Sequence, residues 1–271
     1  MKHIVLNNGV KIPILGLGTY KLVDYKEVKQ AIFKALDLGY RLIDTAEMYA
    51  NEYQIGRAIK EYGIPRDQLF ITSKIWDSSI GYDYTIKSFE ATLERLKTDY
   101  LDLYLIHWPR GYSFIETWSA MTDLYKEGRI RAIGVSNFHR GHLEYLKNNS
   151  EILPVVNQIE IHPYFIQEDL IEYCKNEGII PESWSPLAKG RVTVDNVLSQ
   201  IAEKYGKTPA QVAIRWHIDR GFIVIPKSGN PKRIAENFDV FDFELSEEDI
   251  KRINELNTLR KIGPDPDSFL V

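Results

Sequence analysis

The sequence has little cysteine, no strong charge excess and no long apolar run. Cys174 is the only cysteine among 271 residues, which excludes an internal disulfide and suits a reducing compartment. The net charge of −4 gives no general affinity for nucleic acid. No apolar run approaches the roughly 20 residues that a membrane span needs, and residues 1–9 lack the apolar core of a signal peptide. These absences predict a soluble, cytoplasmic protein with neither nucleic acid nor membrane as a partner.

What the sequence does have is a regular alternation of short apolar runs and amphipathic segments. A composition of 44% hydrophobic and 27% charged residues fits one large α/β domain or two small ones. Runs 4–6 and 10–12 flank Asn7-Asn8-Gly9, which predicts a hairpin. Eight further strands are predicted at 14–17, 41–43, 69–73, 101–106, 132–135, 155–161, 179–184 and 222–225.

Helical periodicity fills the gaps between these strands. The predicted helices are 25–38, 52–62, 85–96, 118–126, 141–147, 168–176, 196–205 and 209–219, followed by 231–238 and 246–256 near the C-terminus. Strands that alternate with helices form parallel sheets. Eight such units in about 250 residues predict a closed (β/α)₈ barrel, a TIM barrel, with an N-terminal hairpin and extra C-terminal helices.

A doubly wound sheet is the alternative fold. It usually carries a Gly-x-Gly-x-x-Gly turn before its first helix. Gly16-Leu17-Gly18 supplies only the first two of those glycines, so the barrel is favoured. The chain shows no linker and no repeat beyond the alternation of strand and helix, and we therefore expect residues 1–271 to form a single domain.

Ionisable residues stand where three neighbouring strands are predicted to end. Asp44, Lys74 and His107 follow the second, third and fourth strands, and Tyr49 lies in the loop after Asp44. Active sites of barrels lie at these strand ends, and these four groups suit proton transfer to a polarised oxygen. Taken one at a time, Asp44 could be a helix cap, Lys74 a solvated loop lysine, and His107 a core histidine whose hydrogen bonds are satisfied. Their joint occurrence on adjacent strands favours an active site.

Several motifs resemble those of the aldo-keto reductase family. Residues 39–46 (GYRLIDTA) with Tyr49 resemble its first signature, residues 133–138 (IGVSNF) its middle signature, and residues 225–228 (IPKS) with Arg233 and Asn237 its third. Residues 16–19 (GLGT) and 157–160 (NQIE) also match, in the family's order. The short loops and residues 263–267 (GPDPD) resemble its prokaryotic members.

The resemblance implies an NADPH-dependent reduction of carbonyl compounds without a metal. Tyr49 would donate a proton to the carbonyl oxygen as hydride reaches the carbon. A free phenol has a pKa near ~10, and the ammonium of Lys74 would ease its ionisation. Asp44 would hold Lys74 charged and aimed, and His107 would orient and polarise the carbonyl.

The resemblance also implies a set of cofactor-binding residues. Ser136, Asn137 and Gln158 would bind the nicotinamide carboxamide, and Trp184 would stack on the ring where the family usually has tyrosine. The full set is Gly18, Thr19, Ser136, Asn137, Gln158, Trp184, Ser185, Leu187, Lys227, Ser228, Arg233, Glu236 and Asn237. Of these, Lys227, Ser228 and Arg233 would bind the adenosine 2′-phosphate, which favours NADP over NAD, and Glu236 and Asn237 would reach the adenine. An ordinary basic helix start at 231–233 is the alternative, but cations are disfavoured there without an anion.

The identity of the substrate is the property that the sequence determines least. Tyr20, Trp76 and Trp108 should line the pocket with His107, and Tyr20 stands where the family usually has tryptophan. A small aldehyde, a dicarbonyl or a keto-sugar would fit as the substrate. We expect the enzyme to be a monomer.

Two other functions stay open on sequence alone. Glu160 and His162 alternate onto one face of a strand and could hold a divalent metal with Asp44 or His107, as in a barrel hydrolase. A non-catalytic nucleotide-binding subunit would keep the cofactor residues and lose turnover. Sensitivity to a chelator separates the first from a reductase, and oxidation of NADPH by an aldehyde separates the second.

Overall fold

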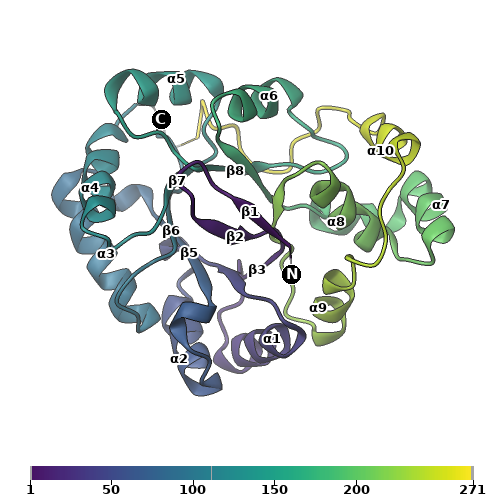
Figure 1. The fold of residues 1–271 in the computed structure, drawn as a ribbon, viewed down its shortest axis with the longest axis horizontal. Helices are drawn as coiled ribbons and strands as arrows, with labels where there is room; N and C mark the ends of the chain where they lie inside the picture. The colour runs from purple at the N-terminus through teal and green to yellow at the C-terminus, as the bar shows by residue number, and fades with distance from the viewer. Residues whose placement is uncertain (1, 111, 270–271) are drawn as a thin grey trace.

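Eight parallel strands form a barrel in the computed structural model, which describes residues 2–110 and 112–269 (Figure 1). Each strand pairs with the next in chain order. Bridges from Leu15 to Val224 and from Gly18 to Lys227 join the first strand to the last. The strands are β3 (Gly16–Gly18), β4 (Leu42–Asp44), β5 (Phe70–Ile75), β6 (Leu103–Ile106), β7 (Ile133–Ser136), β8 (Val156–Glu160), β9 (Ile180–Trp184) and β10 (Ile223–Val224). The predicted barrel is confirmed.

Helices surround the barrel, and six of them have the predicted bounds. Those six are α1 (Tyr25–Leu38), α2 (Glu52–Tyr62), α6 (Glu168–Asn176), α7 (Asn196–Tyr205), α8 (Pro209–Asp219) and α9 (Pro231–Phe238). The others are α3 (Tyr82–Leu96), α4 (Ile115–Lys126), α5 (Arg140–Asn149) and α10 (Glu247–Asn254). The described residues contain no helix long and apolar enough to cross a membrane.

Local capping explains why so many helix ends could be predicted from the sequence. Asp24 accepts a hydrogen bond from the Glu27 backbone before α1, and Gly39 ends that helix with φ 99°. Thr208 and Gln211 form a reciprocal capping box at α8. Such caps satisfy backbone groups that a helix end leaves unpaired. By contrast, α3 begins three residues before the predicted start because its first turn presents exposed Tyr82 and Tyr84 rather than apolar periodicity.

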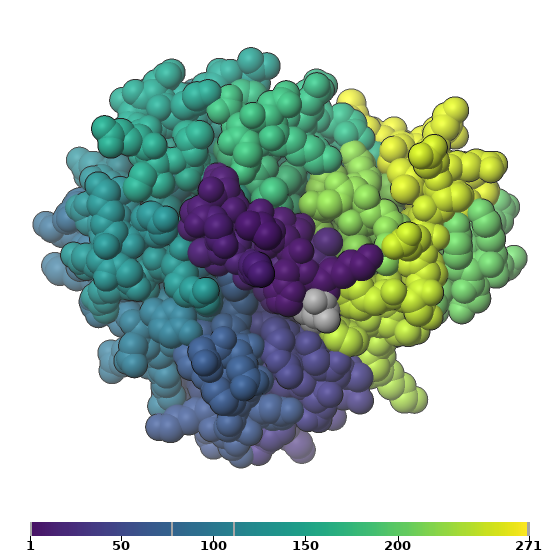
Figure 2. Space-filling view, viewed as in Figure 1, coloured from purple at the N-terminus to yellow at the C-terminus, as the bar shows by residue number. Residues whose placement is uncertain are grey.

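The N-terminal hairpin closes one end of the barrel. β1 (His3–Val5) pairs antiparallel with β2 (Lys11–Pro13), and Figure 2 shows this segment lying across the centre of the face viewed. Its Leu6 and Ile12 pack into the apolar cluster inside the barrel with Leu42. The end that remains for ligand access is therefore the C-terminal end of the strands, where barrel active sites lie.

Candidate functional site

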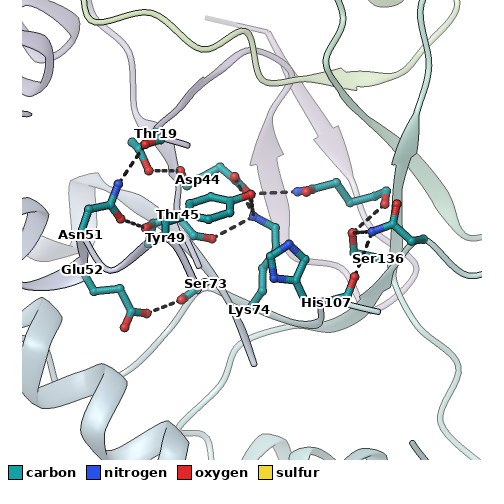
Figure 3. A network of polar contacts seen from close by, with 12 residues as sticks. Thr19, Asp44, Thr45, Tyr49, Asn51, Glu52, Ser73, Lys74, His107 and Ser136 are labelled. Atoms are coloured by element: carbon teal, nitrogen blue, oxygen red, sulfur yellow. Dashed lines mark hydrogen bonds and ion pairs between the residues drawn. The ribbon is translucent and has the colours of Figure 1, made fainter. Parts of the chain in front are cut away.

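A buried ion pair occupies the C-terminal end of the barrel (Figure 3). Asp44 ends β4 and Lys74 lies on β5, with their side chains 2% and 0% exposed. The Lys74 Nζ atom lies 2.7 and 2.8 Å from the two Asp44 carboxylate oxygens and 2.8 Å from the Thr45 carbonyl oxygen. Burial lowers the pKa of Lys74, but Asp44, together with Tyr49 and Glu182, outweighs burial and leaves that pKa above its ordinary value. Lys74 is therefore an ammonium at neutral pH.

Tyr49 faces this ammonium. Its hydroxyl oxygen lies 3.4 Å from Lys74 Nζ. Burial raises the pKa of Tyr49 to about 12; Lys74 opposes that rise and Asp44 adds to it. The phenol thus keeps its proton at neutral pH, and it lies beside a cation, which favours a phenolate.

The imidazole of His107 completes the group. His107 follows β6 and is 6% exposed, with its ring centroid 5.7 Å from that of Tyr49. Burial, followed by the charge of Lys74, holds the pKa of His107 well below its usual range. The ring is therefore neutral, and it carries a single N–H that can donate to an oxygen. The structure brings all four predicted catalytic residues together.

The short turn that carries Tyr49 is held from two sides. It is a single 3₁₀ turn, η1 (Glu47–Tyr49). On one side Asn51 accepts a hydrogen bond from the Thr45 hydroxyl at 2.7 Å. On the other, Glu47 accepts one from the backbone N–H of Trp76 at 2.9 Å. The turn that carries the phenol is thus held by one contact within its own loop and one to the loop after β5, which favours a fixed geometry.

Polar side chains from β7 and β8 lie next to the catalytic group. Asn137, directly after β7, donates to the His107 carbonyl oxygen and to the Ser136 hydroxyl, both at 3.0 Å. The half-buried Trp184 on β9 donates from its indole nitrogen to the Asn137 amide oxygen at 2.8 Å. Gln158 on β8 donates to Asp44 Oδ2 at 2.9 Å. The expected carboxamide-binding residues therefore adjoin both the ion pair and the indole.

Basic residues follow the last strand and begin α9. Asn230 caps this helix by accepting from the backbone N–H groups of Lys232 and Arg233. The first turn contains no acidic residue, and within the described chain neither Lys227 nor Arg233 forms an ion pair. Ser228 is buried beside them. Exposed cations at a helix N-terminus repel its dipole, so this arrangement suits an anion.

The other predicted cofactor residues lie at the end of β3, after β9 and on α9. Gly18 donates its backbone N–H to Pro226 O at 3.2 Å, and a Cβ on it would lie 2.7 Å from Ile225 O, so only glycine fits. Thr19 donates its hydroxyl to Asp44 O at 2.8 Å. Ser185 and Leu187 come just before the 3₁₀ segment η4 (Ala188–Val194). Glu236 accepts a hydrogen bond from the Thr208 hydroxyl, and Asn237 is buried.

Aromatic rings flank the catalytic group. The Tyr20 side chain is 46% exposed, with its ring 5.0 Å from the Tyr49 ring. The Trp76 ring lies 5.1 Å from that of His107. Trp108 packs instead against Phe269, at 4.3 Å between ring centroids. Two of the three predicted pocket aromatics therefore contact catalytic side chains directly.

Comparisons with known proteins test the family resemblance. The model of the Aldo/keto reductase family matches residues 14–258. The chain belongs to this family. Glyoxal reductase of Bacillus subtilis (strain 168) is 51% identical over 267 residues, which cover 98% of this chain and 97% of that protein. Methylglyoxal reductase DkgA of Escherichia coli (strain K12) is 46% identical over 270 residues, with 98% and 97% covered.

Solved structures of family members share the fold. An aldo-keto reductase from a Medee basin deep-sea metagenome library superposes with a TM-score of 0.96 at 45% identity, covering 98% of this chain and 99% of that one. A mutant of Gox0644 in complex with NADPH gives 0.94 at 42% identity, with 98% of both chains covered. The resemblance seen in the sequence motifs is confirmed.

The sequence did not predict that the C-terminal segment packs against Glu160 and Trp184 at this site. Glu160, at the end of β8, accepts hydrogen bonds from the backbone N–H groups of Ile262 and Gly263 at 2.6 and 2.8 Å. A Cβ on Gly263 would lie 2.4 Å from the Trp184 indole, so the backbone packs directly on that ring. Glu160 also bonds His162 at 2.9 Å. Glu160, considered above as a metal ligand, thus anchors the tail of the chain, and His162 bonds Glu160.

We expect Glu160→Ala to loosen residues 262 and 263. Hydrogen bonds to a charged acceptor contribute about 1.5–3 kcal/mol, so the two amides should exchange with deuterium about ten- to a hundredfold faster. Hydrogen exchange read by mass spectrometry measures this, with Glu255→Ala on the exposed surface as control. Unchanged exchange at both amides would show that Glu160 does not hold the tail.

Proposed function

We propose that this protein reduces aldehydes or ketones to alcohols with NADPH, and that Tyr49 is the general acid. The observation that carries the proposal is the Tyr49 hydroxyl placed 3.4 Å from a buried ammonium that is itself bound by both oxygens of Asp44. Carbonyl reduction needs a proton at the oxygen as hydride reaches the carbon. A protonated phenol beside a fixed cation supplies that proton.

Each catalytic side chain has a distinct task in this scheme. His107, neutral because its pKa is low, donates its ring N–H to the carbonyl oxygen and orients it toward Tyr49. Tyr49 passes its hydroxyl proton to the same oxygen. Lys74 stabilises the resulting phenolate, and Asp44 keeps Lys74 in place. Because these groups are held before substrate arrives, little reorganisation opposes the reaction.

The residues around this group fit NADPH. The amides of Asn137 and Gln158 can exchange their present hydrogen bonds for a carboxamide, and the half-buried indole of Trp184 offers a flat face to an aromatic ring. Lys227, Ser228 and Arg233 would hold a phosphate at the α9 N-terminus. When bound, NADPH supplies the hydride. Its nicotinamide end and its phosphate end thus have separate binding groups.

We expect NADPH to bind more tightly than NADH, and Arg233→Ala to narrow the difference. A charge-assisted hydrogen bond to the 2′-phosphate contributes about 1.5–3 kcal/mol, which corresponds to roughly 10- to 150-fold in affinity. Quenching of tryptophan fluorescence during titration with each nucleotide measures both constants. Lys251→Ala, an exposed cation on α10, is the matched control. Equal affinities of the parent protein for the two nucleotides would refute the phosphate site.

Small dicarbonyls are the substrates that we favour. Relatives named for glyoxal and methylglyoxal reduction match nearly the whole chain. The rings of Tyr20 and Trp76 flank Tyr49 and His107, and flat rings suit compact, planar molecules. A panel of glyoxal, methylglyoxal, simple aldehydes and keto-sugars, assayed with NADPH, tests this choice. Higher kcat/KM for keto-sugars than for either dicarbonyl would contradict it.

A further inference from the structure

The interior of the barrel contains a second buried acid, Glu182. It lies on β9, and its register partners are Gln158 on β8 and Ile223 on β10. Ile180 and Trp184, two residues to either side, pack with the apolar cluster inside the barrel. Since alternate residues of a strand share a face, Glu182 projects into the interior together with Gln158. Its side chain has no exposed surface.

Neither carboxyl oxygen of Glu182 has a hydrogen-bond partner among the described residues. The neighbouring donors are directed mainly at other groups. Lys74 directs its N–H groups at the two Asp44 oxygens and the Thr45 carbonyl, and Gln158 donates one amide N–H to Asp44. An ionised carboxylate in this place would be buried without an ion-pair partner, which is strongly unfavourable. The protonated form avoids that cost.

The charged groups that face Glu182 come from two other strands. Burial is the main influence and raises the pKa of Glu182 to about 8; Asp44 on β4 adds to the rise, while Lys74 on β5 and the Gln158 amide on β8 oppose it. The side chains of the described interior at Leu42, Leu105 and Ile223 are apolar. Burial and the charge of Asp44 thus favour the neutral form of this acid at pH 7.

We infer that Glu182 is a positioning residue that acts as a neutral carboxylic acid, and that loss of its proton slows the acid step at Tyr49. This inference rests on the proposed reductase function. With Glu182 neutral, Lys74 and Asp44 stand as a balanced pair. Ionised Glu182 adds a second negative charge near Lys74, which neutralises part of the field that stabilises the Tyr49 phenolate. Tyr49 then becomes a weaker acid.

The test compares the single-turnover rate of carbonyl reduction at pH 6.5 and pH 9 in the parent enzyme and in Glu182→Gln. The protonated fraction of an acid with pKa about 8 falls about tenfold between these values, so the parent rate should fall about tenfold. Glutamine has the shape of the neutral acid and cannot ionise, so the ratio in Glu182→Gln should be near one. Glu255→Gln controls for loss of an exposed acid and should retain the parent ratio.

Three results would overturn the inference. The first is a fall in rate between pH 6.5 and pH 9 that persists in Glu182→Gln. The second is a folded Glu182→Gln enzyme without turnover at pH 6.5, since that would show that the ionised form or the acid proton itself is required. The third is a parent rate that does not fall at all.

An infrared difference spectrum between pH 6.5 and pH 9.5 gives a readout that does not depend on activity. The carbonyl band of a buried carboxylic acid should vanish as pH rises in the parent protein and be missing from Glu182→Gln at both pH values. An identical band in both proteins would refute a neutral Glu182. Failure to oxidise NADPH at any pH, with the band present, would refute the reductase function instead and leave the protonation state standing.

Discussion

Replacement of Tyr49 by phenylalanine should lower the turnover number for carbonyl reduction by about 10²- to 10⁴-fold, the usual worth of general acid catalysis. The phenol is the hydroxyl that faces the Lys74 ammonium, and phenylalanine keeps the ring contacts with Tyr20 and His107 while removing the proton. Binding of NADPH should be almost unchanged, because Tyr49 is not among the proposed cofactor contacts.

Steady-state kinetics together with fluorescence titration of NADPH separates the two effects. Tyr20→Phe is the matched control, because Tyr20 lies beside Tyr49 and also loses a phenolic hydroxyl, but it does not contact Lys74 in the structure. It should lose far less turnover. Near-parental turnover of Tyr49→Phe would eliminate the assignment of the acid.

The second large effect is expected at Lys74, where Lys74→Met should be more damaging than Asp44→Asn. Lys74 acts directly on Tyr49, whereas Asp44 acts through Lys74. Removing the lysine takes away the cation that stabilises the phenolate and leaves the Asp44 carboxylate buried with only the Gln158 amide as a side-chain donor. An unpaired buried charge costs several kcal/mol or takes up a proton. Asparagine at position 44 keeps an acceptor beside Lys74 and loses only charge.

The order of the two variants should appear in the turnover number more than in cofactor affinity. Circular dichroism must first show that both proteins are folded, because each change alters a fully buried ion pair. A folded Lys74→Met enzyme that reduces aldehydes as fast as Asp44→Asn would show that the proposed relay from Asp44 through Lys74 to Tyr49 is wrong.

The barrel could be predicted from sequence because its signals are local. Helices such as α1 and α8 carry caps within a few residues of their ends, and periodicity marks their lengths. The single turn η1 carries no period, so Tyr49 was expected in a loop. The strand β10 is only two residues long, shorter than its apolar run. The single domain and the monomeric state stay predictions.

The site was predictable only where residues follow strands in a known order. Asp44, Lys74 and His107 were placed by that rule, and the structure brings them together with Tyr49. Contacts between segments far apart in sequence were not readable, such as Gly263 against Trp184. The burial of Glu182 was not predicted either, since it follows from the register of β8, β9 and β10. That register is set by packing inside the barrel and not by neighbouring residues.

Reduction with NADPH that carries deuterium at the transferring position of the nicotinamide tests the central claim most directly. With methylglyoxal or another accepted carbonyl, the account predicts an alcohol that contains one deuterium at the former carbonyl carbon for each NADPH oxidised. The rate should be the same with and without a chelator, because the proposed mechanism uses no metal. An unlabelled product, a turnover abolished by the chelator, or binding of NADPH without any oxidation would contradict it.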